Sequence, residues 1–93
     1  MLSENPIKTE KVGKKNLDRE ILRLAIIAEL DAISLYEQLA AATENKAIRE
    51  VLLDVAKEEK THVGEFQTLL LREDEEQVEE LKNGKEVQKE LGL

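Results

Sequence analysis

The sequence predicts an all-α protein whose centre is an antiparallel hairpin of two long helices. Aromatic residues make up only 2% of the 93 residues, so the core must consist of Leu, Ile, Val and Ala, as is typical of helical bundles. Residues 17–42 contain no Gly or Pro, and residues 46–72 contain a single Gly. Only residues 43–45 separate the two stretches, and so short a turn makes neighbouring helices antiparallel.

Residues 1–15 come first and show no helical period. They hold the only proline, four lysines and two glutamates, so we expect a mobile arm that contacts an acidic neighbour or is simply a solvated tail. Asn16 is a good N-cap, and Asp18 and Glu20 follow it in the first turn. The first helix is therefore predicted over residues 17–42 and the second over residues 46–72, which makes residues 16–73 the hairpin.

Residues 74–93 form a short C-terminal helical segment. Asp74 and Gln77 resemble a capping box, which predicts a helix over residues 75–82. Asn83 and Gly84 are expected to break it, one or two further turns follow over residues 85–91, and Gly92 acts as the stop. This segment has too few apolar residues to form a full helix of a bundle. Two long helices cannot close a four-helix bundle, whereas two chains can, so the hairpin is expected to dimerise.

Composition excludes several kinds of protein. The chain has no cysteine, which excludes disulfides and thiolate metal sites and weakly favours an intracellular protein. Its net charge of −7 argues against a nucleic-acid partner. The longest fully apolar run in the first helix covers residues 24–28, far short of a membrane span, and no signal peptide is visible.

Three ionisable residues interrupt faces that should be buried. Glu59 and His62 are three residues apart, so they share one face of the second helix. Glu29 likewise stands on an otherwise apolar face of the first helix. The neighbours of these residues at helical spacing are Ile26, Ile33, Leu52, Val55, Ala56, Val63 and Phe66. A buried carboxylate needs a partner or a metal, and carboxylate with imidazole is a metal-binding combination. We therefore predict one metal site made of Glu29, Glu59 and His62.

These residues carry a family resemblance. Over about residues 17–91 the chain resembles the ferritin-like superfamily, and in particular the encapsulated ferritins, through Glu29, Tyr36 two turns later, and the Glu59-x-x-His62 motif. Carboxylate di-metal bundles use two single glutamates and two Glu-x-x-His pairs, and this chain has half of that set. The resemblance implies a di-iron site shared across a two-fold homodimer interface within a ferritin-like four-helix bundle, and a higher, ring-like homo-oligomer.

The charge count agrees with that arrangement. Four carboxylates from two chains balance two divalent ions, whereas the empty site holds four crowded negative charges. Oxygen ligands with one imidazole per ion suit iron or manganese better than copper, and zinc would bind without redox chemistry.

The resemblance also implies an activity. Encapsulated ferritins are ferroxidases that oxidise Fe(II) to Fe(III) for storage inside an encapsulin shell, so an encapsulin partner and a cytoplasmic nanocompartment are expected. The chain would be either free cargo or a domain of a shell fusion, and residues 91–93 give no secure targeting peptide. Two alternatives stay open. One is a rubrerythrin-like peroxide-reducing di-iron protein, which would need an electron-delivery partner, and the other is a non-catalytic helical-hairpin dimerisation or adaptor module.

Four further residues have predicted roles near the site. Tyr36 is either a hydrogen-bond donor or radical trap beside the metal or an ordinary half-buried tyrosine. Asp31 matches one of two acidic positions through which metal enters some family members, while Ala28 occupies the other. Glu58 and Glu65 are at helical spacing from His62 and are expected to face solvent, although either could orient the imidazole as a hydrogen-bond acceptor.

Overall fold

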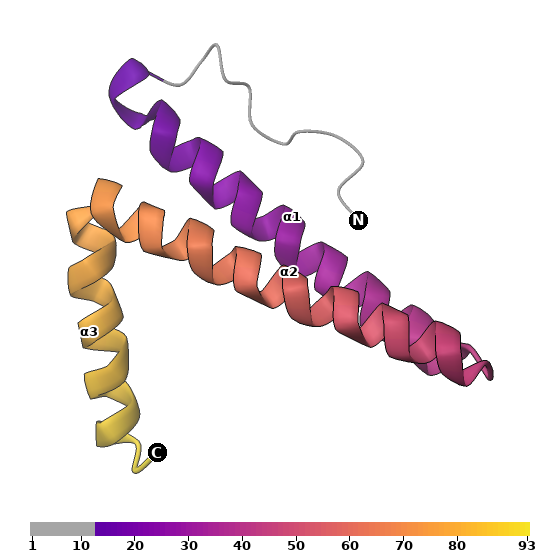
Figure 1. Cartoon of the computed structure of the whole chain (residues 1–93). Coiled ribbons are helices and arrows are strands. Elements are labelled where there is room, and N and C mark those ends of the chain that lie inside the picture. Colours follow the sequence, from indigo (N-terminus) through magenta and orange to yellow (C-terminus); the bar gives the residue numbers. More distant parts are fainter. Residues whose placement is uncertain (1–12) are drawn as a thin grey trace.

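The computed structural model of the chain describes residues 13–93 and contains three helices over that range. α1 spans Lys14–Ala42, α2 spans Lys46–Glu73 and α3 spans Glu75–Glu90. The first two lie side by side as an antiparallel hairpin, and α3 turns away from the end of α2 (Figure 1). The described residues form no strand, so the predicted all-α class is confirmed. None of the described helices is long and apolar enough to cross a membrane.

The start of α1 differs from the prediction. The helix begins at Lys14 rather than at residue 17, and its N-cap is Gly13 rather than Asn16. The backbone N–H of Asn16 donates to the carbonyl of Gly13 at 2.9 Å, within an additional first turn. Lysine has a good helix propensity and glycine is an acceptable N-cap, so nothing obliges the helix to start at the asparagine. The rest of the predicted mobile arm, residues 1–12, lies outside the described residues.

The turn between α1 and α2 occurs where the sequence predicts it. Asn45 is the N-cap of α2, and its side-chain oxygen accepts a hydrogen bond from the backbone N–H of Ile48 at 3.1 Å. Arg49 reaches back from α2 and donates to the carbonyls of Ala40 and Thr43. One α2 side chain thereby satisfies carbonyl groups left open at the end of α1, which holds the hairpin closed at this end.

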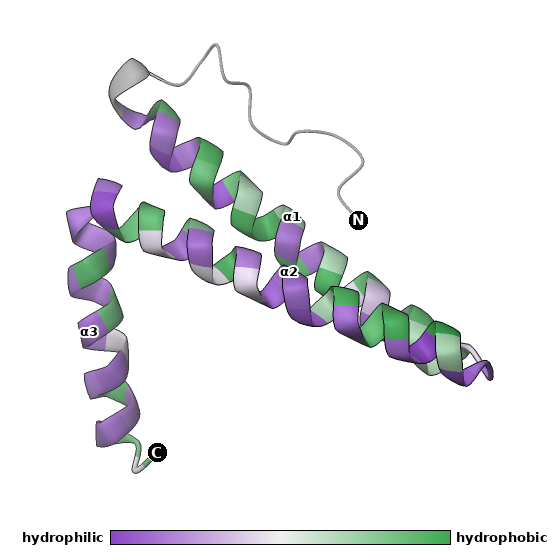
Figure 2. Cartoon of the chain, in the orientation of Figure 1, coloured by the Kyte–Doolittle hydropathy of each residue, from purple (hydrophilic) through white to green (hydrophobic). Residues whose placement is uncertain are grey.

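The hydrophobic core of the hairpin is thin. Among the described residues the buried apolar side chains are Ile33 and Ala40 on α1 and Ala56 and Leu70 on α2, and no large side chain is fully buried. Larger apolar side chains stay exposed; Leu30, for example, is 51% exposed. Figure 2 shows hydrophobic residues distributed along both long helices, whereas α3 is mostly hydrophilic. Each long helix therefore has more apolar surface than its neighbour covers, and dimerisation stays a prediction.

A buried carboxylate joins the start of α3 to α1. Asp74 is 5% exposed, and its side chain caps α3 by accepting a hydrogen bond from the backbone N–H of Gln77 at 3.1 Å, as the sequence predicts. The guanidinium of Arg23 donates to the same carboxylate at 2.8 Å, and Arg19 donates to the carbonyl of Glu73. The Gln77 hydrogen bond chiefly, with help from Arg23, outweighs the effect of burial and lowers the pKa of Asp74.

The continuity of α3 corrects a second prediction. Asn83 and Gly84 lie inside one unbroken helix instead of ending it. An exposed interior glycine costs only about 1 kcal/mol, and the side-chain amide of Asn83 donates to Glu80 one turn earlier at 3.3 Å. The helix ends where glycine is needed: Gly92 has φ +78°, and the backbone N–H groups of Gly92 and Leu93 donate to carbonyls in the last turn.

Candidate metal centre

The three residues predicted to bind metal meet across the contact between α1 and α2. One ligand atom each from Glu29, Glu59 and His62 lies within 4.8 Å of the other two. Glu29 precedes the buried Ile33 by four residues, and Glu59 follows the buried Ala56 by three, so both carboxylates lie on faces that contribute to the core. Helical spacing therefore places each residue on a core-facing side of its own helix, and the packing of α1 against α2 brings the three together.

One nitrogen of the imidazole faces both carboxylates. Nδ1 of His62 is 3.3 Å from Oε2 of Glu59 and 3.6 Å from Oε2 of Glu29. The Glu29 and Glu59 side chains are 22% and 19% exposed, while His62 is 46% exposed. The group therefore lies at the edge of the core, with the carboxylates on the inner side and the imidazole on the outer side.

The site has an unsatisfied negative group. Oε2 of Glu29 is buried and accepts no hydrogen bond. Within residues 13–93, His62 is the only ion-pair partner of either glutamate, since no lysine or arginine reaches them. Shielded carboxylates without a full set of donors are costly, and a divalent cation between them removes that cost. The donor set thus fits a hard divalent cation, and the binding of metal by these residues stays a prediction.

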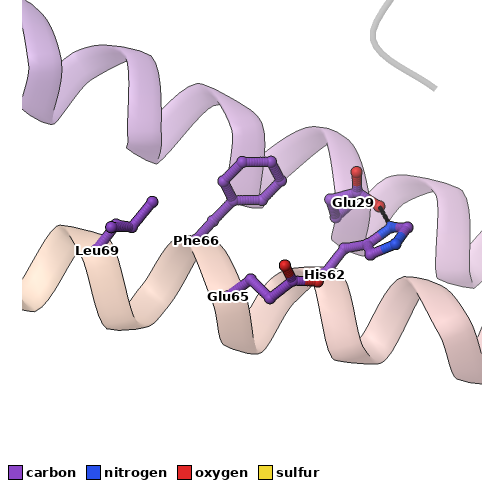
Figure 3. A pocket seen from close by; sticks show the side chains of 5 residues that line it. All are labelled: Glu29, His62, Glu65, Phe66 and Leu69. Atoms are coloured by element: carbon purple, nitrogen blue, oxygen red, sulfur yellow. Dashed lines mark ion pairs between the residues drawn. The ribbon is translucent and has the colours of Figure 1, made fainter.

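An open pocket of about 400 Å³ gives access to the group. It is lined by Glu29, His62, Glu65, Phe66 and Leu69, and Figure 3 shows these side chains between the two helices. Phe66 and Leu69 supply an apolar wall, and Glu65 is the second carboxylate of the lining beside Glu29. The predicted solvent-facing role of Glu65 is thus incomplete, because this exposed side chain also borders the pocket. Its spacing of three residues from His62 is the sequence signal that already marks it as a residue able to orient the imidazole.

The other residues predicted to act near the site do not line the pocket. Tyr36 and Asp31 are half-buried on α1, and neither lines the pocket. Asp31 is also not one of the three residues that converge on a common point. Glu58 is exposed and does not line the pocket, in agreement with a solvent-facing role. The proposed roles of Tyr36 beside the metal and of Asp31 in metal uptake stay predictions.

Comparison with known proteins identifies the family of the chain. The family model for rubrerythrin matches residues 20–91, which include both long helices from the second turn of α1 onward and all three candidate ligands. The chain belongs to the rubrerythrin family.

This family lies in the ferritin-like superfamily, and the predicted resemblance to encapsulated ferritins is confirmed. The chain is 61% identical over 93 residues to a ferritin-like-encapsulin shell fusion protein of Pyrococcus furiosus, covering 98% of this chain and 27% of that protein. It is 40% identical over 78 residues to the encapsulin nanocompartment cargo protein EncC of Myxococcus xanthus, covering 81% of this chain and 60% of that protein. The chain thus spans only part of the curated relatives that it matches.

A solved structure supports the same assignment. The crystal structure of the encapsulated ferritin domain from Pyrococcus furiosus matches with a TM-score of 0.83 and 57% identity, over 100% of this chain and 98% of that one. Both the helical hairpin and the projecting third helix are included in that match, because it covers the whole chain. The ferritin-like fold predicted from the sequence is therefore confirmed.

Proposed function

We propose that this rubrerythrin-family domain is a ferroxidase of the encapsulated-ferritin type, which oxidises Fe(II) to Fe(III) with oxygen. The observation that carries the proposal is the convergence of Glu29, Glu59 and His62 around a buried carboxylate oxygen that accepts no hydrogen bond. Iron is the substrate in this reaction, and manganese or zinc are possible substitutes in the site.

The side chains have separable tasks in this proposal. The two carboxylates bind Fe(II) and stabilise Fe(III) more strongly, because oxygen anions attract the higher charge more. That difference favours loss of one electron from each iron to oxygen. Nδ1 of His62, which faces both carboxylates, supplies the third ligand. The apolar wall of Phe66 and Leu69 limits water on one side of the site.

We further propose that two copies of the chain complete the site. A di-iron carboxylate centre uses about six protein ligands, and one chain brings three to the same point. Exposed apolar residues on α1 and α2, Ile27 and Leu30 among them, offer surface for a second copy. These two observations support a homodimer in which each chain supplies the same three ligands, and ring-like assembly of such dimers is part of the same proposal.

The proposed location is an encapsulin compartment in the cytoplasm, with the encapsulin shell as partner. It rests on relatives described as an encapsulin fusion protein and an encapsulin cargo protein. A hairpin this small has too little surface to close a storage cage by itself, so iron storage is expected to require the shell. Holding of hundreds of irons per oligomer by the isolated chain would contradict this part of the proposal.

The activity is tested by adding ferrous iron aerobically and following near-ultraviolet absorbance. Wild type is expected to oxidise iron faster than buffer, and Glu29→Ala, Glu59→Ala and His62→Ala are each expected to lose the rapid phase. The matched control is Glu58→Ala, which removes an exposed carboxylate from the same helix and should retain most of the rate. A wild-type rate no faster than buffer would favour the adaptor alternative, and equal loss in all four variants would show that the site is misassigned.

The family match also supports a second candidate. Rubrerythrin is the family whose model matches residues 20–91, and a rubrerythrin-like peroxide-reducing di-iron protein is an alternative left open by the sequence. In that case the pre-reduced protein should consume hydrogen peroxide much faster than oxygen. Comparing the two oxidants under single-turnover conditions separates the alternatives, because a ferroxidase of the proposed type must react rapidly with oxygen itself.

A further inference from the structure

His62 presents only one of its two ring nitrogens to the metal-binding group. Nδ1 is the atom within 3.6 Å of both Glu29 and Glu59. A cation held by these three residues therefore takes Nδ1, and the proton of the neutral ring must then reside on Nε2. No hydrogen bond to Nε2 is present among the described residues. Histidines that bind metals usually donate the other ring N–H to a carboxylate, a carbonyl or water, so this ring still needs an acceptor.

Helix geometry selects one carboxylate for that role. Side chains of an α-helix lean toward its N-terminus, so His62 leans back toward Glu59, and Glu65 leans back over the turn that carries His62. The two glutamates are each three residues from the histidine, and at that separation Glu59 already comes within 3.3 Å of Nδ1. Glu58 lies four residues before His62 and leans away from the ring, which leaves Glu65 as the α2 carboxylate directed at it.

The pocket supports the same choice. Glu65 and His62 line it together with Glu29, whereas Glu58 does not. Figure 3 shows the Glu65 side chain extending along α2 toward His62, from the side of the histidine on which Leu69 also lies. Glu65 is exposed and forms no ion pair within residues 13–93, so it is available to turn onto the ring.

We propose that Glu65 is a positioning residue, which accepts a hydrogen bond from Nε2–H of His62 and holds the imidazole with Nδ1 directed at the metal. This inference rests on the proposed metal-binding role of His62. Glu65 itself does not contact the metal. Its effect is to fix the tautomer and the ring orientation, so that the histidine binds without first having to be ordered.

The test compares Glu65→Leu, which removes the acceptor, with Glu65→Gln, which keeps an acceptor oxygen and removes the charge. Anaerobic titration with Co²⁺, followed by its visible absorbance, gives the affinity. Glu65→Leu is expected to weaken Co²⁺ binding by about 10-fold or more, and Glu65→Gln to restore most of the loss. Glu58→Leu, the matched control on the same helix, should bind as wild type does.

A second measurement reports the hydrogen bond directly. The chain has a single histidine, so its ring signals need no assignment in nitrogen-15 NMR spectra. The Zn²⁺-loaded wild type should show a slowly exchanging Nε2–H proton, which Glu65→Leu loses and Glu65→Gln keeps. If Gln binds Co²⁺ as weakly as Leu does, Glu65 acts through its charge and the positioning role is wrong. An unchanged Nε2–H in Glu65→Leu would overturn it as well. Failure of wild type to bind Co²⁺ at all would instead reject the metal site itself.

Discussion

Glu29→Gln is expected to stabilise the metal-free protein and to destabilise the metal-loaded one. The substitution keeps the size of the side chain and removes its charge. Ligand atoms of Glu29 and Glu59 lie within 4.8 Å of each other. Two like charges at that distance repel by about 1 kcal/mol in a water-like medium and by about 3.5 kcal/mol at an effective dielectric constant of about 20. Both side chains are mostly shielded but keep some contact with solvent, so the gain should lie between these figures, and the variant should gain at least about 1 kcal/mol.

The assay is unfolding followed by circular dichroism at one protein concentration and at pH 8. In the presence of a chelator, a gain of about 1 kcal/mol corresponds to a rise in Tm of roughly 4–8 °C for a chain of this size. Saturating Zn²⁺ should make wild type the more stable of the two proteins. A ligand that binds only the folded protein, at a concentration 100 times its Kd, stabilises it by roughly 2.7 kcal/mol. The variant lacks one of three ligands and should lose most of that gain.

Two results would refute this reasoning. A variant less stable than wild type in chelator would mean that Glu29 is already satisfied in the folded protein, contrary to its buried Oε2 without a hydrogen bond. The same order of stability with and without Zn²⁺ would mean that Glu29 is not a ligand. Glu58→Gln removes an exposed charge from α2 and serves as the control, since it should change neither the Tm in chelator nor the Tm in saturating Zn²⁺ appreciably.

Three further predictions concern assembly, the α3 junction and the interior of α2. Metal should saturate at one tight ion per chain, and chelation should shift the oligomer toward smaller species; two tight ions per chain, or an oligomer indifferent to chelator in light scattering, would show that each chain closes its own site. The lowered pKa of Asp74 means that its stabilising effect is present above the unfolded pKa of about 4 and is lost as pH falls through the folded pKa. Asp74→Asn should therefore reduce the loss of unfolding free energy at acidic pH. An unchanged dependence of the unfolding free energy on acidic pH would contradict this. Gly64→Ala should stabilise α2 by about 1 kcal/mol or less, because a Cβ there meets no atom within 4 Å; if the substitution instead weakens assembly, a second copy approaches at this position.

Local rules were sufficient for much of the fold. The short turn, the capping of α3 by Asp74 and the stop at Gly92 each depend on residues a few positions apart, so their chemistry is readable from the sequence. The same is true of the choice of Glu29, Glu59 and His62, because a charged residue on an apolar face is recognisable from its helical neighbours alone.

The failures of local rules are equally specific. Asn16 is expected to begin a helix and Asn83 to end one, yet each lies inside a helix. Their preferences amount to about 1 kcal/mol or less, which the extension of a favourable helix offsets. Sequence also gave no indication that Arg23 holds the carboxylate that caps α3, since the two residues are 51 positions apart.

The helical period by itself determined which residues of this protein share a face and therefore which three form the candidate site. Only the tertiary structure decided that Glu29 and His62 approach across two helices, that Nδ1 is the nitrogen between the carboxylates, and that Glu65 rather than Glu58 borders the pocket. The reason is geometric. Periodicity fixes the direction of a side chain around its own helix axis, but the distance between two helices and their relative position along the axes depend on how the whole interface packs.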